Sequence, residues 1–410
     1  MAIQDGVEIR FITAEEIGDY GAAVNRGFGH DGRPDAEGGI DRFMATNVLE
    51  ATIAAFDEGK IVATFGACDL DVTVPGGSVP SAGTTQVTVH PTHRRRGILT
   101  QMMRMHLEQA IDRDQPMAVL WASEERIYGR FGYGPACFGL DLSIAARSTT
   151  VPPGPSDVTV RMLYPEEAAE ALPPIFEQHR SNNPGVFART PGWWRARILA
   201  DLEHWRGGAT SLRFVEARRA GEGVGYVAYR HRHPANDWDE GTTQIIELVA
   251  LDDMVRRTLW SFITNIDLYR NVSWWNAPVD EPVLIEADRN RSVKWSQIDT
   301  MWIRPLDVVR VLEARRYRAE GNLVFEVADP FLGRGGRFEL EVTEGVGHCR
   351  STTAEPELTM DISDLGSLYL GGRTATALAR AARIEGCGEA MAKADDLFRT
   401  DRPPYCIEEF

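Results

Sequence analysis

Apolar and polar residues follow one another in runs that predict a repeated order of strands and helices. Residues 52–74, TIAAFDEGKIVATFGACDLDVTV, contain two β-rich runs around Asp57 and Lys60, which is the pattern of a β-hairpin. TTQVTVHP is a further strand that ends at Pro91, and MAVLWASE is a short apolar strand. Between these two strands apolar residues recur at helical spacing, namely Leu99, Met103, Leu107 and Ala110. Strand, loop, helix and strand in this order predict a crossover unit and therefore an α/β domain.

A helix and a loop precede this unit, and a linker follows it. ITAEEIGDYGAAVNRGF begins with Thr13 and Glu16 at the spacing of a capping box, and the acidic loop GFGHDGRPDAEGG comes next. STTVPPGPSD combines Ser, Thr, Pro and Gly without periodicity, which is typical of a linker. We therefore predict a first domain over residues 1–150.

The same order of elements returns in residues 151–300. GVGYVAYRHRHP and TTQIIELVALDD predict a hairpin, MVRRTLWSFITNID a helix and NVSWWNAP a further strand. At the junction of strand and helix, however, this copy has Asp252 and Asp253 and neither glycine nor arginine. We predict a degenerate copy that does not hold a phosphate, followed by an α+β module over residues 301–410.

Composition and charge narrow the classes of function. With 43% hydrophobic residues in 410 the chain can form sizeable cores, and a net charge of −16 makes nucleic acid a poor partner and a cationic substrate a better one. The five cysteines show neither CxxC nor a zinc-ligand spacing, so we expect no structural metal and a reducing compartment. The absence of a leader-like start and of a long apolar run predicts no membrane association and a cytoplasmic protein.

The segment QVTVHPTHRRRGILTQMM carries the clearest chemical signal. A strand delivers Arg94, Arg95, Arg96 and Gly97 to the first turn of a helix, where unpaired N–H groups and the helix dipole attract anions. Guanidinium groups suit phosphate oxygens, and glycine allows a phosphate to approach the backbone. The alternative is a solvated basic turn.

The motif resembles the pyrophosphate loop of the GCN5-related N-acetyltransferases, although Leu99 stands where the general motif has a small residue. VTVHPTHRRRGIL followed by ASEERIYGRFGYGP resembles the narrower Eis (enhanced intracellular survival) family. This resemblance implies tandem GCN5-related acetyltransferase folds, the second one degenerate, and a C-terminal α+β sterol-carrier-protein-like domain with DLGSLYLGG. It also implies acetyl-CoA as co-substrate, an aminoglycoside-like or lysine-like amine as acceptor, and a homohexamer.

The resemblance also implies roles for individual residues. Val87, Thr88 and Val89 would pair through their backbone with the pantetheine arm, and Ser123 and Glu124 would flank the cofactor. The pyrophosphate loop would consist of Arg94, Arg95, Arg96, Gly97, Ile98, Leu99 and Thr100. Tyr128 would be the general acid, and the carboxylate of Phe410 the general base.

Acid–base chemistry is consistent with these roles. A primary amine, with a pKa of roughly 10.4, must lose a proton before it attacks a thioester, and a phenol with a pKa of about 10 can protonate the leaving thiolate. Tyr133 competes with Tyr128 for this role, and either tyrosine could simply pack in the glycine-rich turn. A terminal carboxylate, with a pKa of roughly 3.5, is a weak base unless burial raises its pKa.

Further residues are candidates for the acceptor pocket. The acids in question are Asp31, Asp35, Glu37, Glu408 and Glu409, each of which could equally be a solvated surface charge. Trp121 and Gln86 stand where relatives have other residues, so they bear on the choice of acceptor. In DRPPYCIEEF, the prolines and the apolar Ile407 and Phe410 favour a docked segment over a frayed one. A non-enzymatic protein that binds an apolar ligand with a residual acetyltransferase fold is the alternative function.

Overall fold

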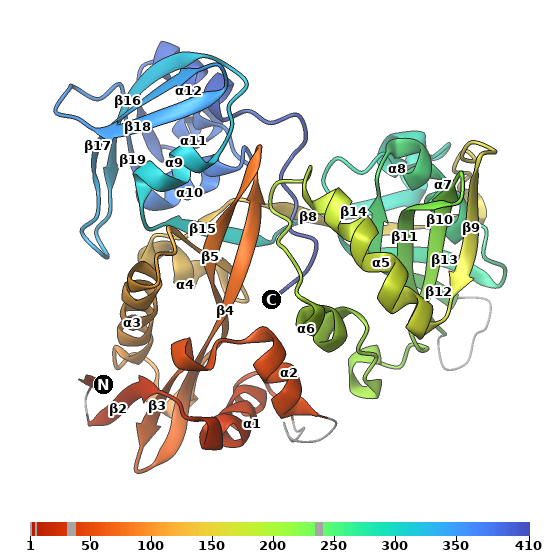
Figure 1. Cartoon of the computed structure of the whole chain (residues 1–410), viewed down its shortest axis with the longest axis horizontal. Helices are drawn as coiled ribbons and strands as arrows, with labels where there is room; N and C mark the ends of the chain where they lie inside the picture. The colour runs from red at the N-terminus through yellow and green to blue at the C-terminus, as the bar shows by residue number, and fades with distance from the viewer. Residues whose placement is uncertain (1, 5, 31–37, 234–240) are drawn as a thin grey trace. The chain divides into compact units, whose positions relative to one another are not determined.

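The computed structural model describes residues 2–4, 6–30, 38–233 and 241–410, and its elements are labelled in Figure 1. The first sheet has the strand order β1-β2-β3-β4-β5-β6-β15-β7. Its strands are β1 (Ala2–Gln4), β2 (Val7–Phe11), β3 (Ile53–Asp57), β4 (Lys60–Val74), β5 (Gly77–Val89), β6 (Met117–Trp121), β7 (Gly134–Pro135) and β15 (Met301–Pro305). Its helices are α1 (Ile17–Gly27), α2 (Gly39–Thr46), α3 (Ile98–Asp112) and α4 (Glu125–Tyr128).

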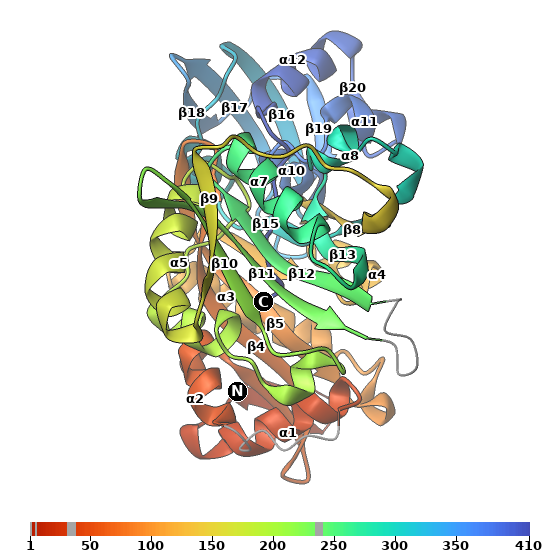
Figure 2. The same cartoon turned by 90° about the vertical axis from the view of Figure 1, so that its right-hand side faces the viewer.

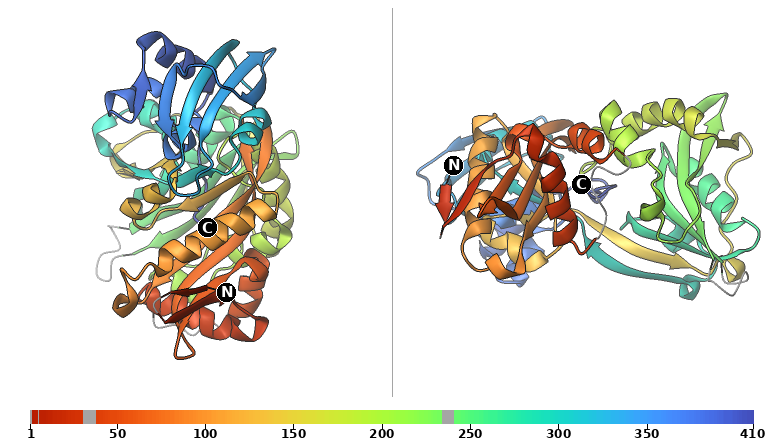
Figure 3. Two further views of the ribbon diagram at one scale, coloured as in Figure 1. Left: turned by 90° about the vertical axis from the view of Figure 1, so that its left-hand side faces the viewer. Right: turned by 90° about the horizontal axis from the view of Figure 1, so that it is seen from below.

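Helices cover both faces of this sheet. Successive residues of a strand point to opposite faces, so neighbouring residues contact different helices. On β3, Ile53 and Ala55 pack in the cluster that includes α3, whereas Ala54 and Phe56 pack in the cluster that includes α1. α1 and α3 accordingly lie on opposite faces of the strands (Figure 3). The predicted capping box of Thr13 and Glu16 is present directly before α1, and the predicted hairpin of β3 and β4 is confirmed.

The second sheet has the order β14-β8-β13-β12-β11-β10-β9. Its strands are β8 (Phe138–Ile144), β9 (Val158–Leu163), β10 (Arg213–Arg219), β11 (Glu222–Arg232), β12 (Gly241–Ala250), β13 (Tyr269–Pro278) and β14 (Val293–Asp299). Its helices are α5 (Pro165–Arg180), α6 (Pro191–Trp193), α7 (Asp253–Thr264) and α8 (Val283–Glu286). On β10, Phe214 packs on the side of α5 and Val215 on the side of α7, so these helices cover opposite faces of the sheet (Figure 2).

The two sheets exchange strands, which the sequence did not reveal. β8 follows the first acetyltransferase motif in the chain but lies between β13 and β14 in the second sheet. β15 follows the second sheet in the chain but lies between β6 and β7 in the first. As a result, the first compact unit comprises residues 1–137, 301–401 and 409–410, and the second comprises residues 138–300 and 402–408. The domain boundaries predicted from the sequence lie at residues 150 and 300. The compact units of the structure change at residues 137/138, directly before β8, and 300/301, directly before β15.

The C-terminal module forms a third sheet with the order β18-β17-β16-β19-β20. Its elements are α9 (Val308–Ala314), β16 (Gly321–Ala328), β17 (Gly336–Thr343), β18 (Val346–Ser351), β19 (Leu358–Asp361), α10 (Ile362–Tyr369), α11 (Ala375–Arg380), β20 (Ile384–Gly386) and α12 (Gly388–Phe398). α10 contains the DLGSLY part of the DLGSLYLGG motif and is buried along its whole length. It packs on β7, where a Cβ added at Gly134 would lie 1.8 Å from the Ser363 carbonyl oxygen. In the described part of the chain, every helix is too short or too polar to cross a bilayer.

Candidate active site

Strands β5 and β6 separate along their length and leave an open edge. Their parallel pairing runs from Ser81 opposite Met117 to Thr84 opposite Leu120, whereas β5 continues to Val89. A bulge between the pairs Thr64–Thr88 and Gly66–Thr85 accompanies the separation, and Gln86 there has a left-handed conformation with φ 53°. In the structure as described, β6 therefore does not pair with residues 85–89, which include the predicted pantetheine-binding residues Val87, Thr88 and Val89.

The Gln86 side chain belongs to this bulge. Its Oε1 is buried and has no hydrogen-bond partner in the described structure. A buried amide oxygen without a partner is costly, and a bound N–H group would satisfy it. The Gln86 oxygen lies next to Gly66, where an added Cβ would be 2.8 Å from this oxygen.

The arginine-rich loop between β5 and α3 contains two residues with left-handed backbone conformations. Arg95 and Gly97 both adopt left-handed conformations, with φ of 65° and 79°, and Gly97 is the N-cap residue of the 15-residue helix α3. A non-glycine residue such as Arg95 is strained in this conformation. Arg94 and Arg95 are exposed, and Nε of Arg94 donates a hydrogen bond of 3.2 Å to the Val89 carbonyl.

The turn before this loop is held by a chain of polar contacts. Thr92 Oγ1 lies 2.8 Å from Nδ1 of both His90 and His93, and Nε2 of His93 lies 2.9 Å from Asp57 Oδ2 on β3. These histidines therefore connect the loop to the hairpin of β3 and β4. They lie in the turn and not on the helix.

Tyr128 ends the short helix α4 and is 4% exposed. Burial raises the pKa of its phenol above the ordinary value, and a hydrogen bond with the Ser123 side chain acts in the opposite direction. The net result is a phenol that keeps its proton at neutral pH. Ser123 and Glu124 are exposed, so the predicted cofactor-flanking residues lie where a ligand could reach them.

Tyr133 is the competing tyrosine. It belongs to a buried chain of polar contacts with Thr84 and His106. Its ring meets that of Tyr128 edge to face with centroids 6.3 Å apart. The Tyr133 hydroxyl lies 3.1 Å from Thr84 Oγ1, which in turn lies 2.9 Å from His106 Nε2. Burial raises the pKa of Tyr133 and lowers that of His106 to about 3, so both groups are neutral near pH 7.

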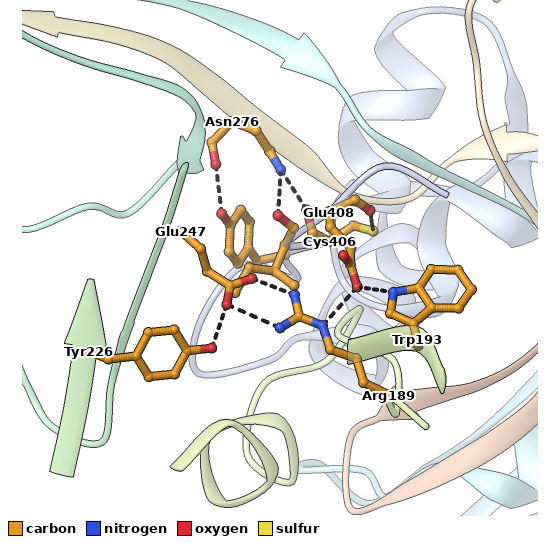
Figure 4. Close-up of polar contacts among 9 residues, drawn as sticks. Arg189, Trp193, Tyr226, Glu247, Asn276, Cys406 and Glu408 are labelled. Atoms are coloured by element: carbon orange, nitrogen blue, oxygen red, sulfur yellow. Dashed lines mark hydrogen bonds and ion pairs between the residues drawn. The ribbon is translucent and has the colours of Figure 1, made fainter. Parts of the chain in front are cut away.

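The segment at residues 402–408 belongs to the second unit and is docked there, as Figure 4 shows. Glu408 accepts hydrogen bonds of 2.8 Å from Nε of Arg189 and from Nε1 of Trp193. Burial raises the pKa of this carboxyl, and Arg189 counteracts the effect. Because Glu408 already has these partners, we leave it out of the proposed acceptor pocket.

The other predicted site residues are distributed as follows. Phe410 is buried and groups with the first unit, to which Tyr128 also belongs, and Glu409 is exposed. Trp121 is half-buried at the end of β6. Asp31, Asp35 and Glu37 lie outside the described residues.

Sequence reasoning missed the residues that act through long-range contacts. Thr84 and Arg189 were not candidates, and Arg189 bonds partners 58 and 219 positions away in the chain. A single sequence holds no signal for such a cluster. A weak signal existed for the bulge, because Gln86 already stood out as unusual.

Comparisons with known proteins agree with this architecture. Models of the acetyltransferase (GNAT) domain match residues 8–136 and 185–311, and a model of the sterol carrier protein domain matches residues 308–407. An uncharacterised N-acetyltransferase of Streptomyces coelicolor is 35% identical over 98% of this chain and 100% of its own length. The crystal structure of Eis1 from Mycobacterium abscessus is similar with a TM-score of 0.84 and 29% identity, covering 98% of this chain and 100% of that one.

The fold and these matches define an acyltransferase with two GCN5-related acetyltransferase domains, which takes its acetyl group from acetyl-CoA. The N-acetyltransferase Eis of Mycobacterium tuberculosis is 35% identical over 83% of this chain and 84% of its own. The chain belongs to the Eis family of GCN5-related N-acetyltransferases. The non-enzymatic alternative is therefore set aside.

Proposed function

We propose that the enzyme transfers acetyl directly from acetyl-CoA to a primary amine of a cationic acceptor, with Tyr128 as general acid and the Phe410 carboxylate as general base. The buried phenol of Tyr128, hydrogen-bonded to Ser123, is the observation that carries this proposal. A phenol that keeps its proton at neutral pH can give it to a thiolate as the carbon–sulfur bond breaks. Tyr133 is less suitable, because it is completely buried and its hydroxyl is bonded to the buried Thr84, whereas Ser123 beside Tyr128 is exposed.

The reaction needs three proton transfers. The ammonium first gives one proton to the Phe410 carboxylate, directly or through water. The neutral nitrogen then attacks the thioester carbonyl, and the C–N bond forms. As the C–S bond breaks, Tyr128 protonates the sulfur to release CoA, and the nitrogen loses its second proton to water. Phe410 as a whole residue is 8% exposed.

Donor binding is assigned to the open edge and the arginine loop. Val87, Thr88 and Val89 offer backbone groups to the pantetheine arm, and the two left-handed residues of the loop suit a pyrophosphate. The Val89 carbonyl is bonded to Arg94 in the structure, so this contact competes with the donor at that atom.

The acceptor is proposed to be aminoglycoside-like or a lysine side chain. A net charge of −16 attracts such cations. Glu409, Trp121 and the acids Asp31, Asp35 and Glu37 remain predicted pocket residues. The cytoplasmic location and the homohexamer remain predictions from sequence.

The test measures CoA release with a thiol reagent across a panel of polyamines and aminoglycosides. Tyr128→Phe should lower kcat by roughly 10²- to 10⁴-fold with little change in KM for acetyl-CoA. Tyr164→Phe, at a tyrosine that is 76% exposed in the second unit, is the matched control. A full kcat in Tyr128→Phe would refute the assignment of the acid.

The base is tested separately. One glycine added after Phe410 keeps the phenyl ring and displaces the carboxylate by about 3.5 Å. We expect kcat to fall by at least about tenfold, with acetyl-CoA binding unchanged. An unchanged kcat would refute the role of Phe410 and leave that of Tyr128 intact.

A further inference from the structure

The second acetyltransferase copy has the same open edge as the first. β12 and β13 pair in parallel from Gly241 opposite Tyr269 to Ile245 opposite Trp274. Beyond this point β12 continues to Ala250 and β13 to Pro278 without further pairing between them in the described structure. The opening matches the one between β5 and β6 in its place within the fold.

In the second copy, residues 404–408, here called the tail segment, contact the β13 side of this opening. Nδ2 of Asn276 donates hydrogen bonds to the carbonyls of Cys406 at 2.9 Å and Ile407 at 3.2 Å. In return, the Tyr405 hydroxyl donates to the Asn276 carbonyl at 2.6 Å. Asn276 adopts a left-handed conformation with φ 66°, and the strand is irregular there.

The β12 side holds the same segment through a buried arginine. The guanidinium of Arg189 bonds both oxygens of Glu247 on β12 and, through Nε, the Glu408 carboxylate. Its side chain is fully buried, and Tyr226 on β11 donates a further hydrogen bond to Glu247. Figure 4 shows Arg189 between the two carboxylates. One cation thus joins the sheet to the tail segment.

Apolar contacts complete the seat of the tail segment. Tyr405 and Ile407 are buried in the cluster that contains Leu172 and Phe176 of α5 and Val249 of β12. The Tyr405 N–H also donates to the Pro184 carbonyl at 2.8 Å. The tail segment is therefore a constituent of the second unit's core.

The helix that follows β12 is closed to anions. Asp252 caps α7 by accepting a hydrogen bond of 2.9 Å from the Val255 N–H, and it forms an ion pair with Arg219. A carboxylate at this helix start repels a phosphate. The second copy thus lacks the anion site that the arginine loop provides in the first.

We infer that the tail segment is the resident ligand of the second acetyltransferase copy, and that Arg189 and Asn276 are positioning residues for the Phe410 carboxylate. Phe410 is two residues after Glu408, so its Cα atom stays within about 7 Å, and its carboxylate within about 10 Å, of the Glu408 Cα atom. Fixing Glu408 restricts Phe410 accordingly. The catalytic part of this inference rests on the proposed role of Phe410, whereas the occupation of the opening does not.

Two variants release the tail segment from different sides. Glu408→Ala removes the partner of Arg189 and Trp193, and Asn276→Gly removes both carboxamide bonds while tolerating the left-handed backbone. Arg350→Ala, at an exposed ion pair on β18, is the control. We expect carboxypeptidase to remove Phe410 at least about tenfold faster in both variants and at the original rate in the control, with folding checked by thermal denaturation.

The kinetic and binding measurements separate the possible failures. The expected result is a kcat lowered by roughly 10- to 10²-fold with unchanged KM for acetyl-CoA, and one acetyl-CoA bound per chain in equilibrium dialysis. Unchanged trimming in both variants, or two acetyl-CoA per chain, would overturn the occupied opening. Suppose that carboxypeptidase removes Phe410 faster but kcat is unchanged in Glu408→Ala and Asn276→Gly. If adding a glycine after Phe410 inactivates the enzyme, this result would overturn the positioning role of Arg189 and Asn276. If the added glycine also leaves kcat unchanged, Phe410 is not the base, and the tail segment still occupies the opening.

Discussion

Replacing Arg304 by methionine should destabilise the first unit by about 3–5 kcal/mol, because this arginine forms a buried ion pair next to the Tyr128 turn. Arg304 on β15 is completely buried, and its Nη2 donates to both oxygens of Asp329 at 2.9 and 2.8 Å. Its Nη1 donates at 2.7 Å to the carbonyl of Phe131, three residues after Tyr128. The substitution leaves a buried carboxylate without its cation and a buried carbonyl without its donor.

Calorimetry can test this value. For a unit of about 240 residues, a loss of 3–5 kcal/mol lowers the midpoint of its transition by about 6–20 °C. Arg304→Met combined with Asp329→Leu should recover much of the loss, since replacing both partners removes the unpaired charge. Arg350→Met, at a side chain that is 69% exposed, should cost less than about 1 kcal/mol. A single variant no less stable than this control, or a double variant no better than the single one, would refute the argument.

Three further predictions concern individual residues. His106 has a pKa of about 3 in the folded protein, against an ordinary value of 6.5, so below pH 6.5 the unfolded chain binds a proton that the folded one does not. In His106→Gln the free energy of unfolding should therefore fall less steeply below pH 6.5, by about 1.4 kcal/mol per pH unit, and a pH dependence parallel to that of the wild type would contradict this. Gly134→Ala should prevent accumulation of soluble enzyme, because its Cβ would lie 1.8 Å from a backbone oxygen, whereas Gly129→Ala in the same motif meets nothing within 4 Å and should fold normally in a solubility and thermal-denaturation assay. Gly97→Ala should raise KM for acetyl-CoA by roughly tenfold with little change in kcat, since φ is 79° there; an unchanged KM would argue against the loop as the pyrophosphate site.

Local elements and the chemical motif could be predicted from the sequence, because both depend on short spacings. Apolar residues at helical spacing identified α3, and the turn residues identified the hairpin of β3 and β4. The exchange of β8 and β15 could not be predicted, since Met301–Pro305 has the composition of any buried strand and nothing local specifies its neighbours. The glycines of YGRFGYGP were visible, but that Gly134 is needed for packing against α10 follows only from the structure.

The persistence of the second copy has a physical reason if the tail segment is its ligand. At this opening, the Asn276 side chain on β13 bonds the backbone of the tail segment, and Arg189 pairs with the Glu408 carboxylate. The contacts from Cys406 to Glu408 span three residues, so a change in the length of chain after Glu408 would move the Phe410 carboxylate without disturbing its anchor. The Phe410 carboxylate belongs to the main chain, so no side-chain rotamer has to be fixed to position it. The anchored backbone at Glu408 limits where it can lie. If the ligand of the second copy changed from a nucleotide thioester to the protein's own chain, an anion site at α7 would no longer be needed. The opening between β12 and β13 would still be needed, because the tail segment occupies it.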